Sequence, residues 1–566
     1  MVYILGIISY MHDTSASLIR DGKIIAAAEE ERFVREKHTE AFPENAINYC
    51  LKKAGITIDE IDHVAVSWVP WKGIIHNSTV ILAQALRNPY LFKSRFDRGQ
   101  GYLGQMNSVF RIKSMIIKKF RPRRDINIHF IDHHLAHAAS CYMLSKFKNA
   151  AILTMDGMGE KATILMAKGY GNRIKKIKEV NYPHSVGHFY SLFTKFLGFK
   201  THSGEGKIMG LAPYGNPEVF RKKFSSLYSV DDRGNFRLNT NIAAYQMCQK
   251  NRYTDEMLSM FGKPRIPESK ITQRHCDIAA SLQWATEHIG VKLANYLHKK
   301  TNSDSLCMAG GVMLNSAMNY KILNKTPFRD IFIHPASNDA GTSLGAAVFL
   351  YNKLTKKRTD FNSVYLGPDY DDEEIKKALD KAGVDYDKCE SPQKDAARSL
   401  YDGRIIGWFQ GRMEWGPRAL GNRSILADPR NREMKDILNS RVKHREGFRP
   451  FAPSVLAEYY KEYFRIDIPV PHMLIIADVI DDKKKIIPAV THIDGTARLN
   501  TVTKEENPDY WELINEFRRL SRVPVILNTS FNIRGQPIVE NPEQALECFL
   551  NTGIDILYIG NYVVRK

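Results

Sequence analysis

The chain opens with an apolar run, a polar turn and a second apolar run in Tyr3-Ile-Leu-Gly-Ile-Ile-Ser-Tyr-Met-His-Asp-Thr-Ser-Ala-Ser-Leu-Ile19. The same design returns in Ala151-Ile-Leu-Thr-Met-Asp-Gly-Met-Gly-Glu-Lys-Ala-Thr-Ile-Leu-Met166. Short apolar runs separated by a tight polar turn predict pairs of β-strands. A duplicated strand-turn-strand unit therefore predicts two related halves that face one cleft.

Helical patterns accompany these strands, and they make the fold α/β rather than all-β. The clearest run from Glu44 to Ala54 and from Cys276 to Lys300. The polar stretch from Asn352 to Asn362 interrupts the apolar pattern, and a new alternation of helices and strands follows it. We therefore expect two domains, over residues 1–355 and 363–566.

Composition indicates a soluble, folded protein with anionic partners. The 566 residues are enough for two to four domains, and 43% are hydrophobic and 25% charged. Lys and Arg number 81 against 62 Asp and Glu, so the formal net charge is +19. Such a charge favours phosphorylated metabolites, nucleic acid or an acidic surface, without choosing among them.

The cysteines and the N-terminus point to the cytoplasm. Seven scattered cysteines include no C-x-x-C pair, which disfavours a disulfide scaffold and a cysteine zinc site. The start Met1-Val-Tyr-Ile-Leu-Gly-Ile-Ile-Ser-Tyr-Met-His-Asp13 lacks the features of a signal peptide, and no stretch approaches the ~18 apolar residues of a membrane span. We expect a cytoplasmic protein without a membrane partner.

The basic run from Arg111 to Arg124 has two interpretations. It is rich enough in Lys and Arg to form a nucleic-acid patch. Its apolar residues recur at helical spacing, however, which favours a solvated surface helix.

A histidine pair gives the sharpest local signal for chemistry. His133 and His137 stand four residues apart in Ile131-Asp-His-His-Leu-Ala-His-Ala-Ala-Ser140, so one helical turn would place both imidazoles on one face. His134 occupies the position of the zincin glutamate, which excludes metalloprotease chemistry. Spacing alone leaves a metal site and a histidine-rich polar core equally open. Asp339, in a Gly-rich helix start, is a candidate third ligand, with a plain N-cap as the alternative.

A second cluster is basic and lies in the C-terminal part. Two segments, Trp415-Gly-Pro-Arg-Ala-Leu-Gly-Asn-Arg-Ser424 and Arg441-Val-Lys-His-Arg-Glu-Gly-Phe-Arg-Pro-Phe-Ala-Pro453, interleave Arg and Lys with Trp, Phe and Pro. The small polar side chains of Val525-Ile-Leu-Asn-Thr-Ser-Phe-Asn532 end a β run. This pattern favours a packed phosphate pocket over a solvated basic face.

Nucleotide fingerprints are absent or weak. The segment Gly204-Glu-Gly-Lys-Ile-Met-Gly210 is neither a Walker A motif nor a dinucleotide fingerprint. The Gly310-Gly311 turn before a predicted helix could approach a ligand, but by itself an ordinary βα turn is the better interpretation.

Several motifs in order resemble one family, the O-carbamoyltransferases of the nodulation-protein U and cephalosporin-carbamoyltransferase type. They cover essentially the whole chain: His12-Asp-Thr-Ser-Ala-Ser17, Glu30-Glu-Arg-Phe33, His133-His-Leu-Ala-His137, Asp156-Gly-Met-Gly-Glu160, Gly204 to Gly215, Gly310-Gly-Val-Met-Leu-Asn315 and Arg445 to Pro453. The resemblance implies an N-terminal actin/Hsp70-like (ASKHA) domain and a C-terminal YrdC-like domain. Asn500 departs from the family's Gln, which puts only that side chain's role in doubt.

The resemblance also implies site residues. In the N-terminal domain His133, His137 and Asp339 would hold Fe²⁺, and His12 and Asp13 would position or deprotonate the acceptor. A plain strand-turn role for Asp13 stays equally open. Nucleotide contacts there would be Asp156, Gly157, Gly159, Lys207, Gly310, Gly311 and Asn315. In the C-terminal domain carbamoyl phosphate and ATP would meet Arg418, Arg423, Lys443, Arg449, His492, Arg498, Asn528 and Ser530.

The implied activity is ATP-dependent O-carbamoyl transfer. Carbamate is a poor electrophile, so its conversion to a carbamoyl-adenylate supplies a leaving group, with Mg²⁺ accompanying ATP. The partners would be carbamoyl phosphate, ATP and a hydroxylated small molecule or sugar, with nucleic acid disfavoured and a homodimer compatible. Two alternatives stay open: a tRNA-modification component, which the net charge suits, and a HypF-like maturation protein, which the lack of C-x-x-C disfavours.

Overall fold

The computed structural model describes residues 1–87, 111–245 and 253–566, which fold into two compact units. The N-terminal unit comprises Met1–Glu30 and His38–Phe361, and the C-terminal unit comprises Glu31–Lys37 and Asn362–Lys566. The chain therefore enters the C-terminal unit briefly after its first three strands, and returns to it after residue 361.

The first sheet of the N-terminal unit is built around the N-terminal strand. Its order is β3-β2-β1-β4-β5, with the first three strands antiparallel and the last two parallel to β1. Gly6 of β1 is needed because a Cβ there would lie 2.0 Å from the carbonyl oxygen of Ser343. The strands are β1 (Tyr3–Ile8), β2 (Ser15–Arg20), β3 (Lys23–Glu29), β4 (His63–Val66) and β5 (Asn127–Phe130).

The second sheet repeats this topology. Its order is β12-β11-β6-β7-β8, in which β6, β7 and β8 form an antiparallel meander and β11 and β12 run parallel to β6. The strands are β6 (Asn149–Met155), β7 (Ala162–Tyr170), β8 (Arg173–Asn181), β11 (Ser305–Ala309) and β12 (Asp330–Ile333). The predicted duplication is confirmed, because each half places its meander and its two parallel strands in the same order.

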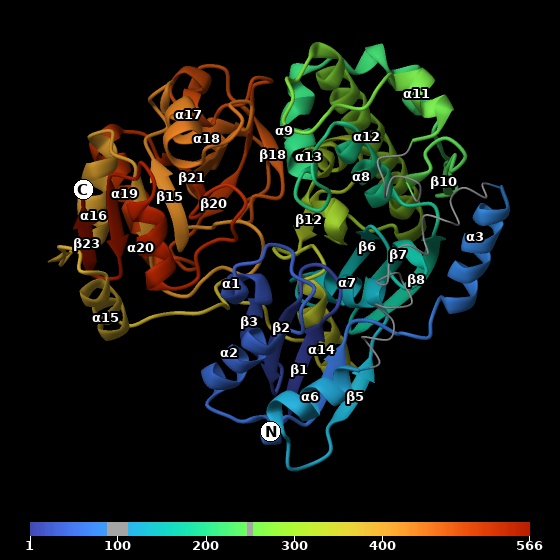
Figure 1. Cartoon of the computed structure of the whole chain (residues 1–566), viewed down its shortest axis with the longest axis horizontal. Coiled ribbons are helices and arrows are strands. Elements are labelled where there is room, and N and C mark those ends of the chain that lie inside the picture. The colour runs from blue at the N-terminus through green and yellow to red at the C-terminus, as the bar shows by residue number, and fades with distance from the viewer. Residues whose placement is uncertain (88–110, 246–252) are drawn as a thin grey trace. The chain divides into compact units, whose positions relative to one another are not determined.

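Two helices, one packed on each sheet, contact one another. Helix α7 (His133–Tyr142) packs against β6, β7 and β11, and α14 (Gly341–Thr355) packs against β1, β2 and β4 (Figure 1). Their apolar and small side chains are buried, which places the core of this unit between its two halves. The N-terminal ends of both helices therefore lie near the strand ends that carry the predicted polar turns.

The remaining helices of the N-terminal unit include both long ones predicted from sequence. They are α1 (Glu30–Val34, which crosses the boundary between units), α2 (Glu44–Ala54), α3 (Ile74–Arg87), α6 (Ile112–Phe120), α8 (Val186–Phe196), α9 (Glu205–Leu211), α10 (Arg221–Ser225), α11 (Asp255–Phe261), α12 (Gln273–Thr301) and α13 (Ser316–Lys325). A small ribbon pairs β9 (Tyr228–Val230) with β10 (Phe236–Leu238). Helix α6 buries Ile112 and Ile116 and exposes lysines, which confirms the predicted amphipathic surface helix.

The C-terminal unit is also α/β. Its eight-stranded mixed sheet has the order β13-β23-β22-β14-β15-β21-β16-β20. The strands are β13 (Asp387–Lys388), β14 (Ile406–Phe409), β15 (Arg423–Ala427), β16 (Ala452–Leu456), β20 (Asn500–Val502), β21 (Val525–Ser530), β22 (Ile556–Ile559) and β23 (Tyr562–Arg565). The predicted α/β class is thus confirmed in both units.

Smaller elements complete the C-terminal unit. A three-stranded sheet contains β17 (Phe464–Arg465), β18 (Ile476–Val479) and β19 (Thr496–Arg498). The helices are α15 (Asp372–Ala382), α16 (Pro392–Tyr401), α17 (Met434–Ile437), α18 (Tyr460–Tyr463), α19 (Pro508–Ser521) and α20 (Pro542–Leu550). Among the described helices of the chain, none has the length and apolarity needed to cross a membrane.

Candidate functional site

Four buried side chains of the N-terminal unit converge on one point. His133 and His137 lie one turn apart on α7, Asp156 follows the end of β6, and Asp339 lies just before α14. Each can offer a ligand atom, and these atoms lie within 4.8 Å of one another. The arrangement places two imidazole nitrogens and two carboxylate oxygens where a divalent transition-metal ion could bind.

The distances within this four-donor cluster are too long for tight hydrogen bonds in most pairs. His133 Nε2 lies 3.2 Å from Asp156 Oδ2 and 3.5 Å from Asp339 Oδ1. His137 Nε2 lies 3.8 Å from Asp156 Oδ2 and 3.6 Å from Asp339 Oδ1. Both ring nitrogens of His137 and Oδ1 of Asp339 are buried without a hydrogen-bond partner in the described part of the chain. Such buried polar atoms need a ligand, and a bound cation fits this donor set.

The charges of the four-donor cluster stabilise one another. Burial opposes the charged forms, but the neighbouring Asp339 and Asp156 carboxylates raise the pKa of His133 well above its usual value. Burial likewise opposes ionisation of Asp156, yet the hydrogen bond to His133 and the nearby His137 imidazole hold its pKa well below the usual value. Burial and the Asp156 charge oppose ionisation of Asp339, but His12 and His133 lower its pKa. Both carboxylates are therefore ionised at neutral pH and suited to bind a cation.

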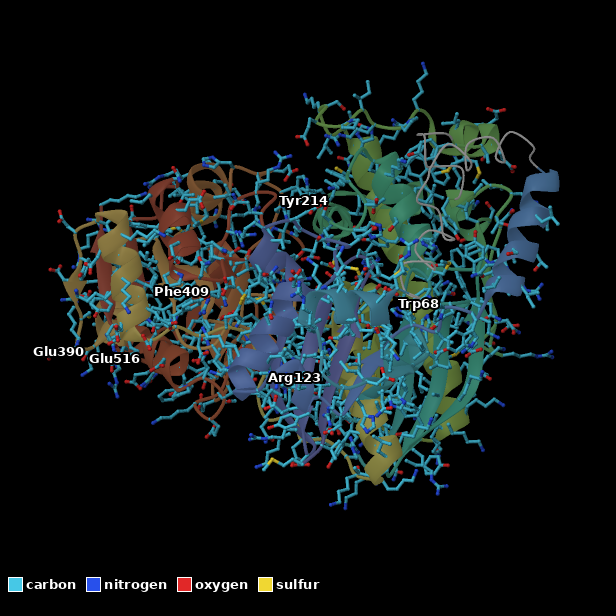
Figure 2. The ribbon with its side chains drawn as sticks, turned by 60° about the horizontal axis from the view of Figure 1, so that its bottom comes forward. Trp68, Arg123, Tyr214, Glu390, Phe409 and Glu516 are labelled. Atoms are coloured by element: carbon cyan, nitrogen blue, oxygen red, sulfur yellow. The ribbon has the colours of Figure 1, made fainter. Side chains whose placement is uncertain are left out.

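Surrounding groups fix the N-terminal end of α7. The Asp132 side chain caps the helix by accepting from the Leu135 amide at 3.0 Å, and Lys72 pairs with Asp132. Glu160 accepts from the backbone amide of His133 at 3.1 Å, and burial raises its pKa to about 7. Trp68, labelled in Figure 2, packs against the His133 ring with 5.3 Å between ring centroids. These contacts orient the histidines before any ligand binds.

Asp156, predicted to contact a nucleotide, lies in the four-donor cluster. Its Oδ2 is 3.2 Å from His133 Nε2. Its Oδ1 accepts from the Gly311 backbone amide at 2.9 Å, so that amide is already used. Because β6 ends beside the start of α7, the fold brings Asp156 to the histidines, which the sequence pattern alone could not reveal.

The other residues predicted to contact a nucleotide lie in turns or at helix starts, except Lys207, which lies within a helix. Gly310 has φ 104°, and a Cβ there would lie 2.1 Å from the Met155 carbonyl oxygen, so this turn requires glycine. The Asn315 side chain caps α13 by accepting from the Met318 amide and also bonds to Gln283. The three remaining residues are Gly157 and Gly159, in the turn after β6, and Lys207, on α9.

His12 and Asp13 lie beside the four-donor cluster. His12 Nε2 is 3.9 Å from Asp339 Oδ2, and its Nδ1 is 3.2 Å from Asp13 Oδ2. Burial lowers the pKa of His12, but Asp339, Asp13 and Asp156 together raise it to about 10. The His12 side chain is 32% exposed while that of Asp339 is 1% exposed, so His12 connects the cluster to solvent.

Four arginines of the C-terminal unit form an arginine group: Arg418, Arg445, Arg449 and Arg498. Burial and the charge of Arg449 lower the pKa of Arg418 to about 10. Burial, followed by the charges of the other three arginines, holds the pKa of Arg498 well below its usual range. Burial and the charge of Arg449 lower the pKa of Arg445 to about 9, an effect that Glu446 partly opposes. Glu446 lies 3.7 Å from Arg449. Several cations gathered near one carboxylate can bind a polyanion.

Lys443 lies among backbone oxygens close to the end of β21. It follows a π-helical turn, Leu438–Val442, a geometry that often occurs at functional sites. Its Nζ donates to the carbonyl oxygens of Ser530 and Asn532 and to Asn532 Oδ1. Burial and the charge of Arg445 lower the pKa of Lys443 well below its usual value. Lys443 and Ser530, both predicted to contact carbamoyl phosphate and ATP, thus lie in direct contact.

Two further predicted residues have buried polar atoms without partners. Asn528 Nδ2 donates to the Ala419 carbonyl and to Ser454 Oγ, while its Oδ1 is buried and unpartnered among the described residues. His492 Nδ1 lies 3.0 Å from Thr496 Oγ1, and its Nε2 is likewise unpartnered. Burial lowers the pKa of His492 to about 4, so its ring is neutral.

Arg423, predicted as a phosphate ligand, is bonded to backbone oxygens of its own unit. Its side chain is fully buried at the start of β15, and its guanidinium stacks 3.6 Å from the centroid of the ring of Phe409, which Figure 2 labels. The guanidinium donates to the backbone carbonyl oxygens of Gln410, Gly411, Asn422, Pro368 and Glu540. These bonds tie loops together, so Arg423 has a structural role in this conformation.

Comparison with known proteins places both units in one family. The family model described as "Carbamoyltransferase N-terminus" matches residues 3–348, and "Carbamoyltransferase C-terminus" matches residues 397–566. The chain is 38% identical to nodulation protein NolNO of Sinorhizobium fredii, over 99% of this chain and 79% of the relative. It is 32% identical to the 3'-hydroxymethylcephem-O-carbamoyltransferase of Streptomyces clavuligerus, over 59% of each chain.

Solved structures are related more distantly. The activator of the 2-hydroxyisocaproyl-CoA dehydratase from Clostridium difficile aligns with a TM-score of 0.33 and 11% identity, over 63% of this chain and 96% of that chain. The sequence relatives are therefore more informative than this structural likeness.

Proposed function

Because the chain belongs to the carbamoyltransferase family and is thus a transferase, we propose that it is an ATP-dependent O-carbamoyltransferase with two sites. The C-terminal unit, YrdC-like by family resemblance, activates carbamoyl phosphate. The N-terminal unit transfers the carbamoyl group to a hydroxyl. ATP and carbamoyl phosphate are cytoplasmic metabolites, and we assign the reaction to that compartment.

The arginine group is the observation that carries this proposal. Its guanidinium groups lower one another's pKa, because their like charges repel. A bound anion would offset this repulsion. Carbamoyl phosphate and the triphosphate of ATP supply such anions, with Mg²⁺ accompanying the nucleotide. Lys443, Asn528 and Ser530 would contact the same ligands, and the unpartnered Asn528 Oδ1 and His492 Nε2 are free for a ligand.

Activation proceeds in two balanced steps at this site. Hydrolysis of carbamoyl phosphate releases phosphate and leaves carbamate. A carbamate oxygen then attacks the α-phosphorus of ATP, pyrophosphate leaves, and carbamoyl-adenylate forms. The arginines neutralise the phosphate charge that would otherwise repel the attacking carbamate.

Transfer uses His12 in the N-terminal unit. The acceptor oxygen attacks the carbamoyl carbon, the bond from that carbon to the AMP oxygen breaks, and the hydroxyl proton passes to His12 Nε2. Asp13, bonded to His12 Nδ1, holds the ring so that Nε2 faces the acceptor. The carboxylates that raise the pKa of His12 belong to or adjoin the four-donor cluster, so a cation bound there would offset their charge and leave Nε2 able to accept the proton. Gly157, Gly159, Lys207 and Gly310 would contact the nucleotide portion.

A metal ion fits the four-donor cluster, and family resemblance favours Fe²⁺. His133, His137, Asp156 and Asp339 would hold it, as the unpartnered buried atoms of His137 and Asp339 support. A bound ion there would act as a Lewis acid toward the carbamoyl carbonyl. The chain's own contribution is to hold the start of α7 and His133 in place through Asp132, Glu160 and Ser67.

The acceptor is a hydroxylated small molecule or sugar, and a panel experiment tests the proposal. The protein is incubated with ATP, carbamoyl phosphate and hydroxylated metabolites, and the products are read by mass spectrometry. A carbamoylated acceptor that requires both ATP and carbamoyl phosphate is expected. Salt-sensitive binding of tRNA, with no carbamoylated small molecule across the panel, would favour the tRNA-modification alternative.

A further inference from the structure

Three donors from separate segments hold the Asp13 carboxylate. Asp13 Oδ2 accepts from His12 Nδ1 at 3.2 Å and from Asn338 Nδ2 at 3.0 Å. Asp13 Oδ1 accepts from His38 Nδ1 at 2.6 Å, the shortest of the three bonds. His38 and Asn338 are 25 and 325 residues away from Asp13 in the sequence, so only the folded chain brings these side chains together.

These bonds determine which nitrogen of His12 faces the four-donor cluster. Nδ1 is held by Asp13 at 3.2 Å, and Nε2 then lies 3.9 Å from Asp339 Oδ2. The carboxylate therefore sets the direction of the His12 ring.

The residues that support His12 are more deeply buried than His12 itself. The side chains of Asp13 and His38 are 10% and 21% exposed, against 32% for His12. Asn338 is buried as well. The support thus lies on the protein side of the His12 ring, and the ring itself is the most accessible member.

Backbone strain accompanies this arrangement. Asp13 and His38 adopt left-handed φ angles of 64° and 59°, and Tyr10, in the same turn as Asp13, adopts 62°. L-residues visit this region rarely, and structures retain such angles where the surroundings enforce them. Two partners of one hydrogen bond are therefore both held in an unfavourable backbone conformation, as expected where side-chain direction matters more than local stability.

We propose that His38 and Asn338 are positioning residues for carbamoyl transfer, which hold Asp13 so that His12 presents Nε2 toward the four-donor cluster. The inference rests on the proposed function for the role of His12, and assigns no substrate contact to His38 or Asn338. It deepens that function by naming two residues that no sequence motif distinguishes.

Paired substitutions of His38 test the proposal. His38→Ala removes the donor, and we expect kcat for transfer to fall about 10- to 100-fold, with the acceptor KM changed less than twofold. His38→Asn keeps an N–H near the position of Nδ1, and is expected to recover at least a third of wild-type kcat. Asn338→Ala should reduce kcat several-fold, because His12 and His38 still donate to Asp13.

Controls separate positioning from loss of structure. His129, on β5, pairs with His63, and His129→Ala is expected to keep wild-type kcat. Metal content and carbamoyl-phosphate-dependent pyrophosphate release without acceptor should be unchanged in all His38 variants. Wild-type kcat in His38→Ala, or equal losses in His38→Ala and His38→Asn, would overturn the proposal.

A second measurement keeps this test independent of the proposed function. The proton shift of His12 Nδ1–H, assigned by its loss in His12→Asn, reports the bond to Asp13 without turnover. We expect a downfield Nδ1–H signal in the wild type and a marked upfield shift or loss of that signal in His38→Ala. The same shift in both proteins would overturn the inference even if transfer is observed, whereas absence of transfer by the wild type would overturn only the proposed function.

Discussion

Arg418 gives the prediction with the most direct link between structure and energy. Its pKa falls from 12.5 to about 10, because it is buried and Arg449 lies nearby, which corresponds to about 3 kcal/mol disfavouring the charged form in the folded protein. A base whose folded pKa lies below its unfolded value destabilises the fold at every pH below the folded pKa, here below about 10. Removal of this charge should therefore stabilise the anion-free protein at neutral pH.

The substitution Arg418→Met removes the charge and keeps much of the apolar stem. For a unit of this size, about 3 kcal/mol corresponds to a rise in the Tm of the C-terminal unit of roughly 6–12 °C. The lost charge-assisted hydrogen bonds to phosphate, worth about 1.5–3 kcal/mol, should lower kcat/KM for carbamoyl phosphate roughly 10- to 150-fold. Stability and activity are thus expected to change in opposite directions.

Calorimetry with and without phosphate, together with pyrophosphate release, measures both effects. Phosphate should raise the Tm of the wild type through binding and should raise that of Arg418→Met much less. Arg404 is exposed in the same unit, and Arg404→Met serves as the matched control, with unchanged kcat/KM. A lower Tm combined with wild-type kcat/KM in Arg418→Met would refute the reasoning.

Three further substitutions test the remaining assignments. His137→Ala should lose the bound metal, measured by elemental analysis, and abolish transfer while pyrophosphate release continues; retained metal would contradict the ligand assignment. Lys443→Ala should abolish pyrophosphate release with metal content unchanged, and metal loss would argue against separate sites. Arg423→Met should destabilise the C-terminal unit by several kcal/mol in thermal denaturation, because buried carbonyl oxygens lose their donor; a normal Tm with lost activity would restore the predicted ligand role.

Local patterns predicted the elements that depend on nearby residues. The strand-turn-strand repeats became β1-β2 and β6-β7, and the helix predicted from Glu44 to Ala54 has those bounds. The spacing of His133 and His137 predicted one helical face, and α7 places both rings in the same cluster. These features follow from periodicity within one or two turns of chain.

Assignments that depend on long-range packing were harder to reach. Asp156 was predicted to contact a nucleotide, and only the placement of β6 beside α7 brings its side chain to His133 and His137. Arg423 stood among other arginines in sequence, yet its position at the start of β15 directs it into the interior. His38 and Asn338 had no signal of their own, because their hydrogen bonds to Asp13 arise from tertiary structure.

The fate of the phosphates tests the central claim most directly. Phosphorus-31 NMR of the protein with ATP, carbamoyl phosphate and an accepted hydroxyl compound resolves every phosphorylated product. We predict AMP, pyrophosphate and phosphate in equal amounts, with pyrophosphate formed in His137→Ala and none in Lys443→Ala. ADP as the nucleotide product, or pyrophosphate without a requirement for carbamoyl phosphate, would contradict activation through a carbamoyl-adenylate.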